Sequence, residues 1–199
     1  MEMEFSENEI IFNRELSQLD ELVLKFVKIL DELKVDYVII SGYIAILFGR
    51  SRNTEDVDLF IEEMHFKKFT EMWKALERNG FECINAENPE SAYNEYLKEK
   101  LAIRFAEKGK FIPNFELKFP KTDMSQYSLR NKITVKLNGE NLLTSKIEPQ
   151  IAYKLYMGSD KDIEDAAHLW ETFKGKINPI IFNKFTKKLG VENKVKLLD

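Results

Sequence analysis

The stretch that decides the fold is residues 37–61, which read YVIISGYIAILFGRSRNTEDVDLFI. It opens with a short apolar run over 37–40 that ends at Ser41-Gly42, a pattern that predicts a buried strand followed by a tight turn. A short apolar helix over 44–48 and a second strand over 56–61 follow. The stretch therefore predicts a strand–turn–helix–strand unit whose second strand faces the turn.

Two aspartates, Asp56 and Asp58, lie in the second of these strands. Because successive side chains of a strand alternate between its faces, the two carboxylates are expected to project side by side. Adjacent carboxylates repel each other unless a cation lies between them, and Mg²⁺ is the hard divalent ion that most often fills that role. The alternative is an exposed strand end at which both carboxylates are solvated.

The turn has a chemical interpretation of its own. A glycine between a buried strand and a helix lets the backbone approach a phosphate group, whose charge the helix N-terminus favours. Ser41 and Gly42 are therefore candidate phosphate-binding residues. Many α/β proteins carry such a junction for packing alone, so the turn becomes informative only beside the carboxylate pair.

Composition limits the classes of protein to consider. A chain of 199 residues predicts one domain, or one domain with a helical appendage. The formal charge of −4 does not mark a general nucleic-acid binder. The single cysteine, Cys83, excludes an intramolecular disulfide. Since no apolar run resembles a signal peptide or is long enough to span a bilayer, we expect a cytoplasmic protein without a membrane partner.

The rest of the chain alternates helix and strand patterns up to about residue 145 and is then purely helical. Helices are expected over 19–34, 66–78, 90–99, 149–157, 161–174 and 178–188, and further strands over 81–85, 101–106, 115–119, 133–137 and 141–143. Ser17, with Asp20 three residues later, predicts the start of the first helix, and residues 1–14 an arm or an edge strand. We therefore predict an α+β fold with a mixed β-sheet flanked by helices over 15–145, and a C-terminal helical bundle over 146–199 packed on it.

The order of these features resembles the nucleotidyltransferase superfamily typified by DNA polymerase beta. That family carries a Gly-Gly or Gly-Ser turn, a short helix and then Asp-x-Asp opening the next strand. The stretch 52–59, RNTEDVDL, is similar to the toxin-like and uncharacterised prokaryotic branch. Ser41 departs from the pattern, because the family usually has glycine there. The resemblance implies a nucleotidyltransferase-like fold and transfer of a nucleoside monophosphate from a triphosphate to an acceptor hydroxyl.

The resemblance also implies a third carboxylate on a neighbouring strand. Glu116, in the run FELKF, is the best match, and Glu107 at a strand end is the alternative. By resemblance, Asp56, Asp58 and Glu116 hold two Mg²⁺ ions and activate the acceptor hydroxyl. The competing interpretation makes Glu116 an exposed strand residue paired with Lys118.

A second match lies in the helical region. Residues 150–154 followed by KDIED at 161–165 are similar to the lysine-bearing helix and Lys-Asp-x-x-Asp motif of the toxin-like branch. The alternative is that acidic residues near 160 only cap a helix. Together the two matches make the following residues nucleotide-binding candidates: Ser41, Gly42, Arg52, Thr54, Lys154, Lys161 and Asp162.

Several partners stay open from the sequence. The donor is expected to be ATP or another nucleoside triphosphate, and the acceptor RNA, a protein or a small molecule. The lysine-rich tail beyond 174 favours RNA slightly, through phosphate contacts. A second hypothesis is a catalytically degenerate module that senses nucleotides or binds a cognate protein, for example in a toxin–antitoxin pair. Ser41 and the glutamate at 116 motivate it.

Overall fold

The structure is a computed structural model, and it describes residues 2–6 and 8–198. Its strands are β1 (Glu4–Phe5), β2 (Glu9–Phe12), β3 (Tyr37–Ile40), β4 (Asp56–Ile61), β5 (Phe81–Cys83), β6 (Ile103–Glu107), β7 (Asn114–Lys118), β8 (Ile133–Leu137) and β9 (Glu140–Thr144). Its helices are α1 (Gln18–Glu32), α2 (Gly42–Leu47), α3 (Phe66–Arg78), α4 (Pro89–Ser91), the π-helical turn η1 (Ala92–Leu97), α5 (Asp123–Arg130), α6 (Ile147–Met157), α7 (Asp160–Thr172), α8 (Pro179–Leu189) and the 3₁₀ segment η2 (Glu192–Leu197).

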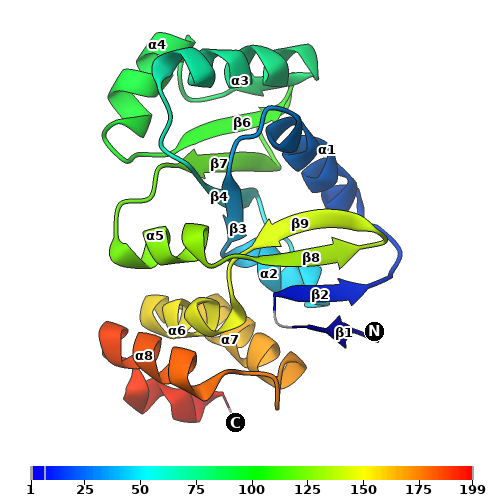
Figure 1. Cartoon of the computed structure of the whole chain (residues 1–199), viewed down its shortest axis with the longest axis vertical. Helices are drawn as coiled ribbons and strands as arrows, with labels where there is room; N and C mark the ends of the chain where they lie inside the picture. Colours follow the sequence, from blue (N-terminus) through cyan, green and yellow to red (C-terminus); the bar gives the residue numbers. More distant parts are fainter. Residues whose placement is uncertain (1, 7, 199) are drawn as a thin grey trace.

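The described strands form one nine-stranded mixed sheet in the order β1-β2-β8-β9-β3-β4-β7-β6-β5 (Figure 1). The strand β4 is central, with β3 antiparallel on one side and β7 parallel on the other. Its burial alternates, so that Val57 and Leu59 are fully buried while Asp56 and Asp58 point to the opposite, partly open face. The predicted mixed sheet flanked by helices is confirmed.

One face of the sheet carries the core. Phe26 of α1 stacks on Phe115 of β7 with ring centroids 3.8 Å apart, and Trp73 of α3 meets Phe105 of β6 edge-on at 5.2 Å. Phe115 lies opposite Val57 and Phe105 across the sheet, so all of these side chains share a face. Helices α1 and α3 therefore cover the apolar face (Figure 1). The other face of β4 and β7 carries Asp56, Asp58 and Glu116.

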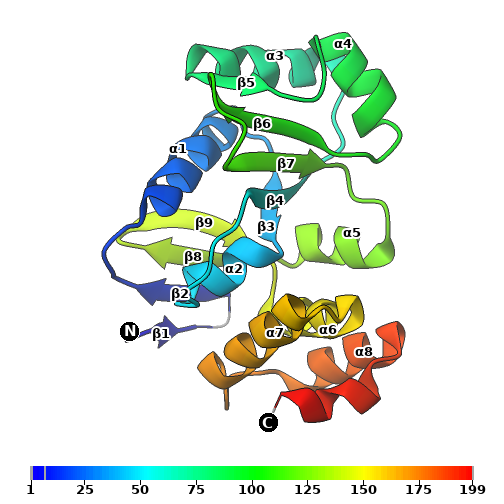
Figure 2. The same cartoon turned by 180° about the vertical axis from the view of Figure 1, so that it is seen from behind.

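The opposite side is occupied by α5 and the C-terminal helices. Figure 2 shows α6, α7 and α8 grouped beside α2 and α5, away from α3 and α4. Helix α6 packs against both α7 and α8, and α7 also contacts α2. The sheet ends with β9 at Thr144 and α6 begins at Ile147. Whether residues 15–145 and 146–199 behave as separate units stays a prediction.

Several elements differ from the sequence expectations. Helix α5 was not expected, because its buried positions include the polar Ser125 and Ser128 and so lack an apolar period. The helix expected over 90–99 is a single turn followed by η1. The arm or edge strand expected over 1–14 forms two strands: β1 lies at the edge of the sheet, as one alternative predicted, whereas β2 is internal because it pairs with both β1 and β8. Positions 1 and 7 lie outside the described residues.

Among the described residues, no helix combines the length and the apolar character needed to cross a bilayer.

The predicted start of α1 is confirmed, and it is more than a local cap. The fully buried Asp20 carboxylate accepts hydrogen bonds from the Arg14 guanidinium at 2.6 and 2.8 Å, from the Tyr43 hydroxyl at 2.7 Å and from the Ser17 backbone N–H at 2.8 Å. Burial alone would raise the pKa of Asp20, but the hydrogen bonds from Arg14, Ser17 and Tyr43 lower it below its ordinary value. One carboxylate thus ties α1 to α2 and to the segment after β2.

Replacing Asp20 by Asn is expected to lower the free energy of unfolding by about 3 kcal/mol, because the partly buried Arg14 charge loses its partner. Since the folded-state pKa of Asp20 is lowered, its contribution is present above the unfolded pKa of about 4 and is lost as the pH falls through the folded value. Urea unfolding at neutral and at acid pH measures both effects. The neighbouring Glu21→Gln serves as the control, and equal stability of the two variants at neutral pH would contradict the assignment.

Candidate active site

A cavity of about 400 Å³ lies on the polar face of the sheet, between β4 and β7, α5 and α6. Polar and charged side chains from five parts of the fold are among those that line it, including Ser41, Asp58, Lys118, Gln150, Lys154 and Asp162. Apolar side chains such as Phe60 and Met124 complete the wall. A concave, mostly apolar pocket with a few convergent polar groups is the form that small-molecule sites take.

A row of charged side chains crosses three strands and meets this cavity at Asp58. Asp58 of β4 stands in register with Glu116 of β7, which stands in register with Arg104 of β6. The Arg104 Nε donates to Glu116 Oε1 at 2.6 Å. Lys118 Nζ lies 3.0 Å from Asp58 Oδ1 and 2.9 Å from Glu116 Oε2. The structure therefore places Glu116 beside Asp58, where the third carboxylate was expected, but with two cationic partners of its own.

The charged groups of this row shift one another's pKa values. Burial, together with the Asp56 and Glu116 carboxylates, raises the pKa of Asp58, while Lys118 opposes the rise. Burial would raise the pKa of Glu116 too, but Lys118 and Arg104 lower it below its ordinary value. Burial would lower the pKa of Lys118, yet Asp58 and Glu116 raise it, so this lysine is a cation at neutral pH.

Asp56 completes the pair on β4. The Thr54 hydroxyl lies 2.9 Å from the Asp56 carbonyl oxygen and 3.2 Å from its Oδ1, which fixes the start of the strand and leaves carboxylate lone pairs free to accept. Within the part of the chain that the structure describes, no group of three or more His, Cys, Asp or Glu side chains is arranged to hold a metal ion. The donor set that fits a hard divalent cation is the adjacent pair of Asp56 and Asp58.

The turn before α2 is strained. Ser41 has φ 64° and ψ −134°, a conformation that a residue with a side chain rarely adopts and that favours glycine. Its backbone N–H donates to the Gln150 Oε1 at 3.0 Å, so α6 holds the turn in place. A Cβ at Gly42 would meet Nη2 of Arg52, so a larger residue there would displace the guanidinium from its present position. Strain of this kind persists mainly at functional sites.

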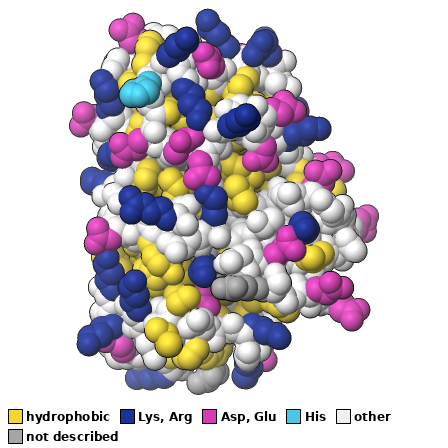
Figure 3. Space-filling model, viewed as in Figure 1, with side chains coloured by type: hydrophobic (Ala, Val, Ile, Leu, Met, Phe, Trp, Pro, Cys, Tyr) yellow, Lys and Arg dark blue, Asp and Glu magenta, His cyan; other side chains and the backbone are white. Residues whose placement is uncertain are grey.

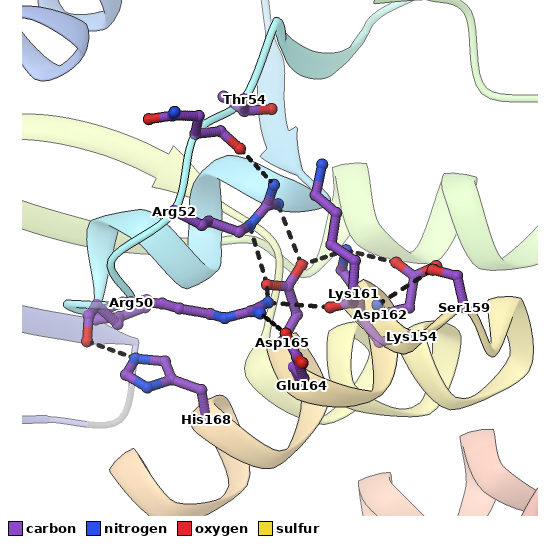
Figure 4. A network of polar contacts seen from close by, with 12 residues as sticks. Arg50, Arg52, Thr54, Lys154, Ser159, Lys161, Asp162, Glu164, Asp165 and His168 are labelled. Carbon is purple, nitrogen blue, oxygen red and sulfur yellow. Dashed lines mark hydrogen bonds and ion pairs between the residues drawn. The ribbon is translucent and has the colours of Figure 1, made fainter.

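A network around Asp165 links the loop after α2 to the C-terminal helices (Figure 4). The fully buried Asp165 carboxylate pairs with Arg50, lies 3.0 Å from the Arg52 Nε and accepts from the Arg52 Nη2 at 3.1 Å. Lys154 Nζ lies 2.7 Å from Asp165 Oδ2 and 2.9 Å from Asp162 Oδ1. Burial lowers the pKa of Lys154 and Asp162 opposes the shift. One carboxylate therefore faces three cationic side chains.

The expected nucleotide-binding residues fall into two groups. Ser41, Lys154 and Asp162 line the cavity together with Asp58, and Gly42 follows Ser41 at the start of α2. The remaining candidates lie elsewhere. Arg52 and Thr54 line a second cavity, together with Glu107, and the exposed Lys161 contributes its backbone carbonyl to Arg50. Glu107 pairs with Lys110 at 2.6 Å and lies at the end of β6.

Sequence reasoning gave no individual role to four residues of the site, which are Arg50, Lys118 as a partner of Asp58, Gln150 and Asp165, although Gln150 and Asp165 lie in the matched stretches 150–154 and 161–165. Asp165 had one signal, since it shares a helix face with Asp162 three positions earlier. The roles of the others depend on contacts between distant segments, which no local pattern reports.

Known structures with similar folds were found, whereas no family model and no curated protein matches the chain. An antigenic nucleotidyltransferase-like protein from Paracoccidioides brasiliensis is 20% identical, with a TM-score of 0.53 over 92% of this chain and 94% of that one. ANT(2″)-Ia in complex with adenylyl-2″-tobramycin is 13% identical, with a TM-score of 0.56 over 86% and 99%. The lincosamide antibiotic adenylyltransferase LnuA, bound to lincomycin, is 11% identical, with a TM-score of 0.51 over 80% and 99%.

Replacing Asp165 by Asn is expected to lower the free energy of unfolding by about 3–5 kcal/mol, because buried cationic side chains lose their shared partner. Its neighbour Glu164 is the matched control, since its side chain is 68% exposed and pairs with Arg50 alone. Glu164→Gln is expected to change the stability by about 0–1 kcal/mol. Chemical denaturation of both variants measures the difference, and similar losses in the two would show that Asp165 is not the centre of the network.

Proposed function

Because the chain has the nucleotidyltransferase fold, we propose that it is an enzyme that transfers a nucleoside monophosphate from a triphosphate to an acceptor hydroxyl in a metal-dependent reaction. The observation that carries the proposal is the position of Asp58 at a cavity that Ser41 and Lys154 also line. A carboxylate pair, a turn at a helix N-terminus and a cationic side chain are the groups that a bound metal–triphosphate complex needs.

Each residue has a distinct role in this proposal. Asp56 and Asp58 would hold a Mg²⁺ ion, which when bound would neutralise phosphate charge and make the phosphorus more electrophilic. The Ser41 hydroxyl and the backbone at Gly42 contact the phosphates. Lys154, held by Asp162 and Asp165, offsets the charge that builds on the leaving pyrophosphate. Arg52 does not contact the phosphates in this proposal. Its guanidinium lies against Gly42 and orders the loop before β4.

The acceptor remains one of three classes, namely RNA, a protein or a small molecule. ANT(2″)-Ia with its adenylyl-2″-tobramycin and LnuA with lincomycin are precedents for small molecules on this fold. Figure 3 shows lysine and arginine side chains interspersed with acidic ones over one face of the molecule, rather than gathered in one basic patch. Incubation with each labelled triphosphate, Mg²⁺ and separated RNA, protein and metabolite fractions identifies the class by the fraction that carries the label.

Asp56→Asn and Asp58→Asn are each expected to reduce Mg²⁺-dependent release of pyrophosphate by about 100-fold or more, because the transition-state charge loses its metal-held partner. Circular dichroism should show that both variants stay folded. Glu55→Gln, an exposed neighbour, is the control and should keep full activity. Full activity in both aspartate variants would refute the proposal. A wild-type chain that binds triphosphate in calorimetry but releases no pyrophosphate would favour the nucleotide-sensing alternative.

Ser41 offers a separate test, because its strain and its proposed role oppose each other. Ser41→Gly removes backbone strain of about 1–3 kcal/mol and is expected to leave the protein as stable as before or more stable. It also removes a hydroxyl donor, so triphosphate affinity should fall about fivefold. Thermal unfolding and calorimetric titration measure the two effects. The exposed Ser51→Gly is the control, and a loss of stability without a loss of affinity in Ser41→Gly would contradict this role.

A further inference from the structure

Lys118 occupies the space between two carboxylates that the family resemblance assigns to metal. Its Nζ lies 3.0 Å from Asp58 Oδ1 and 2.9 Å from Glu116 Oε2, so one ammonium group bridges the two strands. The geometry is built by the sheet, because Asp58 and Glu116 are register partners and Lys118 is two residues beyond Glu116 on the same face. The lysine thus reaches back along β7 to the pair.

Glu116 is also engaged from its other side. Arg104 places Nε and Nη2 each 2.6 Å from Glu116 Oε1, while Lys118 takes the other carboxylate oxygen. The Glu116 side chain is only 10% exposed. Both of its oxygens therefore carry a cationic partner at hydrogen-bond distance, and a metal ion bound by Glu116 would lie next to these cations.

The local charge balance also argues against a metal ion bound by Glu116. Asp56, Asp58 and Glu116 supply three negative charges, and Lys118 and Arg104 supply two positive ones, which leaves one net negative charge. One divalent ion on Asp56 and Asp58 would bring this group to one net positive charge, which the negative charge of a bound triphosphate offsets. A second divalent ion would place two more positive charges within contact of two fixed cations, which like-charge repulsion opposes.

We propose that the Lys118 ammonium takes the place of a second metal ion, so that the chain binds a single divalent cation at Asp56 and Asp58. This inference rests on the proposed function. In it, Glu116 is a positioning residue that holds Lys118 against Asp58 and is not a metal ligand. Lys118 in turn fixes the Asp58 carboxylate and presents a positive charge to the cavity, where the acceptor and the α-phosphate meet.

Counting bound Mn²⁺ tests the inference directly. The full chain is saturated with a non-hydrolysable triphosphate analogue, each of the four bases in turn, and free Mn²⁺ is followed by electron paramagnetic resonance. Ions bound to the analogue alone are subtracted from a matched titration without protein. The wild-type chain is expected to bind one Mn²⁺, and Lys118→Met is expected to bind two, because Asp58 and Glu116 are then free to share an ion.

Further variants separate Lys118 from its surroundings. Lys118→Arg keeps the charge and should bind one ion, and Lys121→Met, another lysine of the cavity wall, should also bind one. Glu116→Gln should leave the Mn²⁺ affinity within about threefold, whereas Asp58→Asn should weaken it at least tenfold. If Lys118→Met fails to fold, the Mn²⁺ count is taken on Lys118→Gln instead and compared with that of the wild-type chain.

The outcomes separate this inference from the function on which it rests. Two ions on the wild-type chain, a single ion on the folded Lys118→Met variant, or a large loss of affinity in Glu116→Gln would overturn the inference and leave the proposed function standing. No Mn²⁺ bound with any analogue would overturn both. One ion on the wild type and two on Lys118→Met support it.

Discussion

The buried Asp165 carboxylate is the interaction on which the rest of the site depends. It lies on α7 and forms ion pairs with Arg50 and Arg52 of the loop after α2 and with Lys154 of α6. Without that shared negative charge, only Asp162 and Glu164 would remain as ion-pair partners for these three cations in a largely buried region. The loop it fixes leads directly into Asp56, and the lysine it fixes lines the cavity, so a single charge sets both walls of the site.

Local patterns in the sequence predicted the elements whose chemistry is local. The apolar run and alternating carboxylates of residues 37–61 gave β3 and β4 with their bounds, and the Ser17–Asp20 spacing gave the start of α1. Helix α5 was not predicted from the sequence, because its inner side faces a cavity and not the core. Serines therefore replace the apolar residues that mark most helices. Its one signal was the capping arrangement of Thr122 and Ser125.

The site residues also divide into those that local patterns predict and those that depend on contacts between distant segments. Asp56 and Asp58 follow from strand alternation, and the place of Glu116 next to Asp58 follows from resemblance and is where the structure puts it. The pairing of Glu116 with Lys118 was part of the competing interpretation and is found in the structure, although Glu116 is buried and not exposed. The other partners could not be predicted, because they depend on register between strands and on pairs such as Lys118 with Asp58, which lie 60 positions apart in the chain. Sequence periodicity reports which face a side chain takes, and register decides which charges then meet.

The hydrogen bond from the Ser41 N–H to Gln150 has a consequence for the timing of maturation. It joins residues 109 positions apart, and the strained turn that it holds has no other partner for that N–H in the described structure. While the chain is being synthesised, β3 and α2 emerge long before α6, so the turn is free to relax until the C-terminal helices arrive. A nascent or truncated chain then carries both aspartates beside a turn that is not yet ordered, so under the proposed function its phosphate-binding turn is complete only once α6 has folded.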